Sequence, residues 1–168
     1  MNHPKIKFTI KNYGDIVAEL YPEKAPKTVE NFLGLVKEGF FSGLIFHRVI
    51  KGFMIQGGGF DTEYEQRQAA SIKGEFASNG FPQNTLKHTR GVLSMARTMI
   101  PDSASSQFFL MHEDSPHLDG QYAAFGKVIE GDEVIDGIAN VRTTTKMMYY
   151  QDWPCDDVVI ESFELIEE

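Results

Sequence analysis

Short alternating apolar segments, separated by turn-forming residues, constrain the fold of this chain most strongly. Ile6, Phe8 and Ile10 alternate with polar residues, and the alternation resumes at Ile16 after the turn residues 12–14. Alternation with a period of two places every second side chain on one face of a strand, so residues 5–20 predict a β-hairpin. Similar short segments predict further strands at 44–50, 53–56, 92–95, 107–111, 123–128 and 158–166.

Two segments have a helical period instead. Apolar residues recur at helical spacing between Val29 and Val36, with Pro26 suited to the first turn and Gly39 to the stop. Residues 132–139 predict a short second helix. About eight strands and two helices, joined mainly by short turns, predict a mainly β fold built as a closed or nearly closed antiparallel barrel. Periodicity alone leaves a β-sandwich open.

Length and composition indicate one globular domain spanning residues 1–168. The net charge of −8 disfavours binding to nucleic acid or to anionic membranes. No apolar run approaches the ~18 residues of a membrane span, and the N-terminus lacks the pattern of a signal peptide. Cys155 is the only cysteine, so an intrachain disulfide is impossible. We therefore expect a cytoplasmic protein, with no membrane association.

Two segments carry the residues best suited to chemistry. In residues 46–58, Arg48 lies among apolar residues and is followed by Gln56 and a run of glycines. This pattern alone also fits an ordinary core hairpin whose arginine reaches solvent. In residues 105–110, alternation puts Gln107 and Phe109 on one face of a strand and two apolar core residues on the other. An amide beside an aromatic ring on one face favours a binding site.

Together these segments resemble the signature of the cyclophilin family of peptidyl-prolyl cis-trans isomerases. The resemblance covers nearly the whole chain in order, and it implies an eight-stranded antiparallel β-barrel capped by two α-helices. The matching stretches are residues 46–50, 52–58, 86–89, 91–96, 106–109, 118–120 and 125–128.

The resemblance also implies roles for individual residues, with no metal and no cofactor. Arg48 is the expected catalytic side chain, and His117 is expected at the rim of the substrate pocket. The pocket for the substrate proline ring is expected to contain Phe53, Met54, Phe109, Leu118 and Tyr122. Contacts to the peptide backbone are expected from Gln56, Ala96, Arg97 and Gln107.

Three of these positions differ from the best-known eukaryotic members and resemble a bacterial-type member. His117, Tyr122 and Arg97 stand where those members carry Trp, His and Asn, respectively. The change at position 117 implies weak cyclosporin binding at most. The implied partners are proline-containing peptides and unfolded or flexible protein segments, and we expect a monomer.

An arginine suits this reaction. Rotation about an X–Pro bond passes through a twisted amide whose nitrogen lone pair is no longer delocalised, with a barrier of about 18–20 kcal/mol. A charged donor aimed at that nitrogen stabilises the twisted state over either planar state. A strict two-residue turn at 51–52 would place Arg48 and Met54 on opposite faces, whereas the resemblance implies that both line one site. We therefore expect an irregular stretch or bulge around residues 50–53.

Other functions remain as alternatives. A non-catalytic module that binds proline-containing segments, or acts as a chaperone, needs the pocket but not Arg48. A barrel that carries a small molecule in its lumen is disfavoured by the large apolar residues on the core faces. Metal binding at His112 and His117, serine hydrolysis at 103–106 and nucleotide binding at 57–59 lack the required motifs. The long irregular stretch 60–90 is expected to have a functional role, and Trp153 is expected to lie in a loop covering the barrel end.

Overall fold

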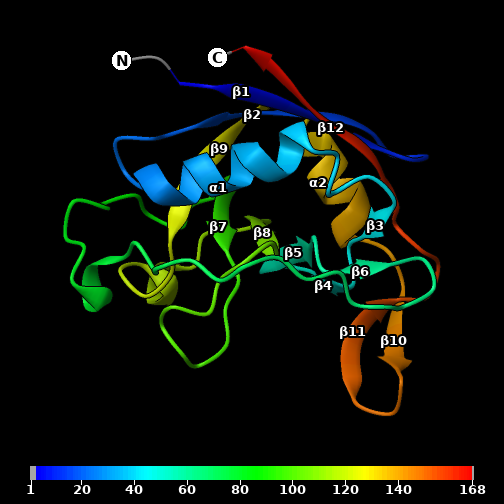
Figure 1. The fold of residues 1–168 in the computed structure, drawn as a ribbon. Helices are drawn as coiled ribbons and strands as arrows, with labels where there is room; N and C mark the ends of the chain where they lie inside the picture. The colour runs from blue at the N-terminus through cyan, green and yellow to red at the C-terminus, as the bar shows by residue number, and fades with distance from the viewer. Residues whose placement is uncertain (1–2, 168) are drawn as a thin grey trace.

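The computed structural model describes residues 3–167 and contains one curled eight-stranded sheet with two α-helices (Figure 1). The order across the sheet is β12-β1-β2-β9-β7-β8-β5-β4, and every neighbouring pair is antiparallel. The strands are β1 (Lys5–Ile10), β2 (Gly14–Leu20), β4 (Arg48–Ile50), β5 (Met54–Gly57), β7 (Val92–Met95), β8 (Phe108–Met111), β9 (Ala124–Glu130) and β12 (Ile160–Glu167).

The two ends of this sheet approach one another just before β4 and β12. The Gly43 amide donates to the Ile160 carbonyl at 2.8 Å, and the Phe46 amide donates to the Val158 carbonyl at 3.0 Å. These bonds flank the short strand β3 (Leu44–Ile45), which pairs with β6 (Phe60–Asp61). The predicted antiparallel barrel is therefore confirmed in the form of a sheet curled upon itself, and the sandwich is wrong.

The two predicted helices are also confirmed. Helix α1 (Pro26–Lys37) begins at the predicted proline, and Gly39 follows its end with a φ of 72°, a left-handed conformation that glycine adopts without strain. Helix α2 (Asp132–Ala139) has the predicted bounds. Helix α1 packs against β12, and α2 packs against β2, β4 and β5 (Figure 1). Two short 3₁₀ helices, η1 (Ala77–Asn79) and η2 (Pro116–Leu118), lie in the connecting loops.

Aromatic side chains fill the interior of the curled sheet. Phe108 lies near the centre of this cluster, with its ring 5.6 Å from that of Phe32 and 5.7 Å from that of Phe41, both edge-on. Edge-to-face pairs of this kind are favourable beyond the apolar area they bury. The lumen is therefore occupied by side chains, which contradicts a carrier barrel. Other fully buried rings in this cluster are those of Phe8, Phe46 and Phe125.

One hairpin was not predicted from the sequence. Strands β10 (Thr143–Lys146) and β11 (Tyr150–Pro154) pair in a separate two-stranded sheet that projects from the barrel (Figure 1). Trp153 belongs to β11 and is 1% exposed, so its placement in a loop was wrong. The segment lacks apolar alternation because most of its side chains face solvent. Within residues 3–167, the structure has no helix long and apolar enough to cross a membrane.

Candidate active site

The candidate catalytic residues form a row across one face of the sheet. Arg48 on β4 pairs with Gln56 on β5, and Gln56 pairs with Phe109 on β8. Residues paired directly across antiparallel strands point to the same face. Phe108 and Leu110 alternate with Phe109 and belong to the interior cluster. The row therefore lies on the outer face of the barrel.

The connection between β4 and β5 brings this row together. Ile50 pairs with Met54, so three residues rather than two form the turn. Gly52 has a φ of 82°, and the Phe53 amide donates to the Ile50 carbonyl at 3.0 Å. A three-residue loop with a left-handed glycine restores Arg48 and Met54 to one face. The expected irregular stretch at residues 50–53 is confirmed.

The outer face contains a small apolar cavity next to Arg48. Its volume is about 120 Å³, and its buried floor consists largely of Met54, Phe109 and Leu118. The Phe109 and Tyr122 rings meet edge-on with centroids 5.8 Å apart. Nine of the predicted site residues line this single cavity, although they come from five separate segments. They are Arg48, Phe53, Met54, Gln56, Ala96, Arg97, Phe109, Leu118 and Tyr122.

A chain of amides holds the guanidinium of Arg48 beside the cavity. Arg48 Nη1 donates to Gln56 Oε1 at 3.3 Å, and Gln56 Nε2 donates to Gln107 Oε1 at 3.0 Å. Gln107, the remaining predicted backbone contact, thus lies beside the cavity rather than in its wall. Because Arg48 is exposed, its charge stays hydrated. Its side chain remains available to donate further hydrogen bonds.

Arg97 is committed to contacts within the protein. Its guanidinium carbon lies 4.7 Å from the ring centroid of Phe76 and 4.6 Å from that of Tyr122. The same group donates to the carbonyl of Gln121 at 2.6 Å and to that of Thr98 at 2.9 Å. These two cation–π contacts restrain the guanidinium. The Arg97 side chain therefore packs against Tyr122 and supports its position, and Arg97 also lines the edge of the cavity.

Two histidines flank the apolar wall. His117 lies at the exposed rim, and its ring stacks on Phe53 with centroids 5.8 Å apart. His88 is buried behind Phe109, where Nδ1 contacts Asp119 Oδ1 at 3.1 Å and Nε2 contacts Ser94 Oγ at 2.8 Å. Burial lowers the pKa of His88, so its ring is held neutral. The His88 contacts support the position of Phe109, a role that the sequence interpretation did not assign.

A larger cavity of about 320 Å³ adjoins the first and shares the residues Gln56, Ala96 and Arg97 with it. Its far side is built by residues from the long stretch 60–90, including Arg67 and Gln68. Arg67 itself donates to the carbonyl of Phe40 at 2.7 Å. The sequence indicated a functional role for this stretch from its length alone. No local pattern identified which of its residues would reach the site.

The curled antiparallel sheet agrees with the comparisons to known proteins. The family described as "Cyclophilin type peptidyl-prolyl cis-trans isomerase/CLD" matches residues 5–165. The chain belongs to the cyclophilin family. The family resemblance and the isomerase class predicted from the sequence are thereby confirmed.

Several cyclophilins are similar to this chain over most of its length. A peptidyl-prolyl cis-trans isomerase of Acinetobacter baylyi is 51% identical, with 92% of this chain and 81% of that protein covered. The peptidyl-prolyl cis-trans isomerase B of Escherichia coli is 46% identical, with 93% and 96% covered. A crystal structure of a cyclophilin-type isomerase from Cryptosporidium parvum gives a TM-score of 0.81 at 30% identity, with 99% of each chain covered.

Proposed function

We propose that Arg48 and the apolar cavity beside it catalyse peptidyl-prolyl cis-trans isomerisation, the reaction for which the cyclophilin family is named. The observation that carries this proposal is the placement of the exposed Arg48 guanidinium at the edge of a small cavity with an apolar floor. Isomerisation breaks no covalent bond, because rotation removes only the partial double-bond character of the amide C–N bond in the twisted state. A nucleophile, a metal ion or a redox group is therefore not required.

The cavity matches a small apolar ring in size and lining. The cavity volume is about 120 Å³. Cavities that enclose drug-sized ligands are typically about 300–1,000 Å³, so this one alone does not hold a large cofactor. Met54, Phe109 and Leu118 supply a floor without charge. A proline ring seated there is held in place while the preceding part of the peptide rotates.

Arg48 supplies the group that distinguishes the twisted amide from the planar one. In the planar amide, the nitrogen lone pair is delocalised into the carbonyl and accepts hydrogen bonds poorly. In the twisted state, the lone pair is localised, and a guanidinium N–H directed at it is stabilising. Because this interaction is stronger in the transition state than in either ground state, it accelerates the rotation in both directions. The hydrogen bond to Gln56 orients the guanidinium before substrate arrives.

The neighbouring polar groups suit an uncharged peptide backbone. Gln56 and Gln107 each carry a donor and an acceptor, and their mutual hydrogen bond aligns the two amides along the cavity edge. Ala96 and Arg97 also line the cavity, and the Ala96 amide donates to the Gln107 carbonyl at 2.9 Å. Two side-chain N–H groups of Arg97 already donate to the carbonyls of Gln121 and Thr98 within the protein. A peptide contact at this edge is thus assigned to the main chain of residues 96–97.

We assign flexible protein segments as the substrates, because an open cavity on the outer face admits a peptide chain running through it. The net charge of −8 and the single cysteine support a cytoplasmic protein without nucleic-acid partners. We further expect the protein to act as a monomer. Cyclosporin is expected to bind weakly, because His117 provides the exposed ring at the rim.

Substitution of Arg48 separates the enzyme from a module that only binds proline-containing segments. Exchange between the cis and trans forms of an Ala-Pro peptide is measured by NMR for the wild type, Arg48→Ala and Arg48→Lys. Losing a preorganised donor is expected to reduce kcat/KM by about 10²–10³-fold in Arg48→Ala. Arg48→Lys is expected to recover little of this loss, because an ammonium lacks the planar fork.

Arg142→Ala is the matched control, since Arg142 is an exposed arginine that does not border the cavity. Its kcat/KM is expected to equal that of the wild type. A folded wild-type protein that binds the peptide without accelerating exchange would reject the isomerase. Equal rates for the wild type and a folded Arg48→Ala variant would reject the role of Arg48.

A further inference from the structure

The three-residue turn that carries Phe53 is anchored to the end of β8 by a histidine. The Gly52 amide donates to His112 Nδ1 at 2.8 Å, and the His112 amide donates to the Phe53 carbonyl at 2.9 Å. The turn is therefore bound through both of its last two residues to the same partner. Phe53 lines the proline cavity, so the position of its ring depends on this anchor.

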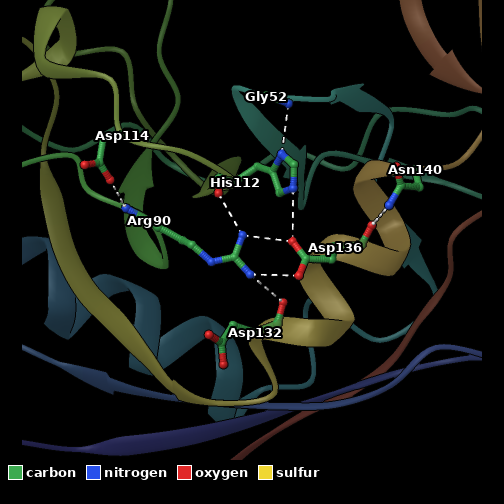
Figure 2. Close-up of polar contacts among 7 residues, drawn as sticks. All are labelled: Gly52, Arg90, His112, Asp114, Asp132, Asp136 and Asn140. Atoms are coloured by element: carbon green, nitrogen blue, oxygen red, sulfur yellow. Dashed lines mark hydrogen bonds and ion pairs between the residues drawn. The ribbon is translucent and has the colours of Figure 1, made fainter.

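The anchor fixes the protonation pattern of the imidazole. A backbone N–H can only donate, so Nδ1 of His112 must be the acceptor and carry no proton. The proton of the neutral ring then lies on Nε2. This nitrogen is 3.0 Å from Oδ1 of Asp136 on α2 and donates to it (Figure 2). Each ring nitrogen thus has one partner, and the two partners lie on different elements.

Arg90 completes the arrangement behind the imidazole. Its guanidinium donates to both carboxylate oxygens of Asp136, at 2.8 and 2.9 Å, and to the carbonyl of His112 at 3.0 Å (Figure 2). A paired fork of this kind fixes the carboxylate orientation. The hydrogen bonds from Arg90 also hold the pKa of Asp136 below its usual range, so Asp136 remains an acceptor. The carboxylate in turn directs the imidazole toward Gly52.

We propose that His112 is a positioning residue for isomerisation, which fixes the Gly52–Phe53 turn against the proline cavity while Asp136 and Arg90 orient its ring. This inference rests on the isomerase function proposed above. A second acidic side chain near this turn, that of Glu113, does not conflict with the proposed tautomer of His112. Glu113 follows His112 in the chain, and its carboxylate lies near Gly52. That carboxylate is an acceptor only, so it cannot replace the Gly52 amide as the partner of the unprotonated Nδ1.

The expected effect is on substrate binding rather than on the chemical step. Phe53 contacts the proline ring in the planar and the twisted states alike, whereas Arg48 favours the twisted state. Loosening the turn therefore removes uniform binding, which raises KM and leaves kcat nearly unchanged. This split distinguishes positioning of Phe53 from damage to the catalytic arginine.

Two substitutions separate the two hydrogen bonds of the imidazole. The oxygen of an asparagine lies as many bonds from Cα as Nδ1 does, so His112→Asn retains an acceptor for Gly52 and loses the contact with Asp136. The nitrogen of a glutamine matches Nε2, so His112→Gln retains the donor to Asp136 and loses the acceptor for Gly52. We expect a KM for an Ala-Pro peptide at least fivefold above that of the wild type in His112→Gln, and within twofold of it in His112→Asn. In both variants kcat is expected to stay within twofold.

The control variant is Asn140→Ala, which removes the side-chain bond from Asn140 to the Asp136 carbonyl at the end of α2 without contacting His112 (Figure 2). It is expected to lower the melting temperature and leave KM unchanged. An increase in KM equal to that of His112→Gln would attribute the effect to general loosening of α2 and overturn the proposal.

Nitrogen NMR of the histidine rings in the wild type gives a test that needs no variant. Long-range proton–nitrogen correlations are expected to show the Nε2–H tautomer for His112, with a slowly exchanging Gly52 amide. An Nδ1–H tautomer overturns the proposal, as does an unchanged KM in a folded His112→Gln variant. These outcomes are read in a protein whose wild type accelerates exchange. A wild type without that activity, but with the expected tautomer, would instead reject the isomerase function.

Discussion

The buried ring of His47 makes this barrel sensitive to acid in a way that one substitution isolates. His47 precedes β4 and is 5% exposed, with its ring 4.7 Å from Phe60 and 5.6 Å from Trp153. Its Nδ1 has no hydrogen-bond partner among residues 3–167. Burial first, and the positive charge of Arg48 second, lower the pKa of His47 from 6.5 to about 4.

The sign and size of the effect follow from that difference. The unfolded chain binds a proton at this ring near pH 6.5, whereas the folded chain binds it only near pH 4. Well above pH 6.5 the His47 ring is neutral in both states and does not change the free energy of unfolding. As the pH falls from about 6.5 to about 4, protonation of the unfolded chain lowers that free energy progressively. At about 1.4 kcal/mol per pH unit, the full loss is about 3 kcal/mol, of which about 2 kcal/mol falls between pH 7 and pH 5.

His47→Phe tests this prediction because phenylalanine keeps an aromatic ring between Phe60 and Trp153 but does not titrate. The free energy of unfolding is measured with urea at pH 7 and pH 5 for both proteins. Other groups that titrate in this range, including buried His88, are common to both and cancel in the comparison. The wild type is expected to lose about 2 kcal/mol more than the variant on acidification. Equal losses in the two proteins would refute a neutral, buried His47.

Two further substitutions probe the interior and the wall of the cavity. Phe108→Ala is expected to lower the free energy of unfolding by about 3–5 kcal/mol, measured with urea, because the ring is fully buried among other aromatic rings; a loss below 1 kcal/mol would contradict a tightly packed lumen. Arg97→Lys is expected to raise the KM for an Ala-Pro peptide severalfold with little change in melting temperature, because lysine cannot keep both stacking contacts with Phe76 and Tyr122. An unchanged KM would remove Arg97 from the support of the cavity.

Most of the barrel was predictable because its periodicity is local. The alternation around Phe8 and the helical spacing around Phe32 each reflect burial of one face, and those side chains are buried in the structure. The same reasoning at 105–110 correctly separated Phe108, which fills the lumen, from Phe109, which lines the outer cavity. The roles of the site residues came from the family resemblance. The need for a non-standard turn at 50–53 came from combining that resemblance with strand geometry.

The remaining features depend on contacts between distant segments, which local patterns do not encode. Trp153 is buried only because β11 folds back next to β4, and its own segment is mostly polar. Likewise, His112, Arg90 and Asp136 come from three separate segments. Their spacing along the chain matches no recognised motif. From the sequence, the acidic residues near His112 suggested only a metal site, which was disfavoured because no metal-binding motif is present.

The placement of the candidate site on the outer face would let one sheet serve both stability and the proposed catalysis. Because side chains alternate along β8, the inward row packs the lumen while the outward row forms the floor of the cavity. A change in Phe109 therefore leaves the interior packing in place, and the floor is held rigidly by a core that substrate never reaches. In the proposed reaction Arg48 donates to a nitrogen that becomes basic only on twisting, so its side chain can remain exposed. A deeply buried guanidinium would carry a desolvation cost that this reaction does not require. The proposed reaction thus requires a rigid apolar floor and a hydrated arginine next to it. The outer face of a sheet whose inner face is packed can provide both.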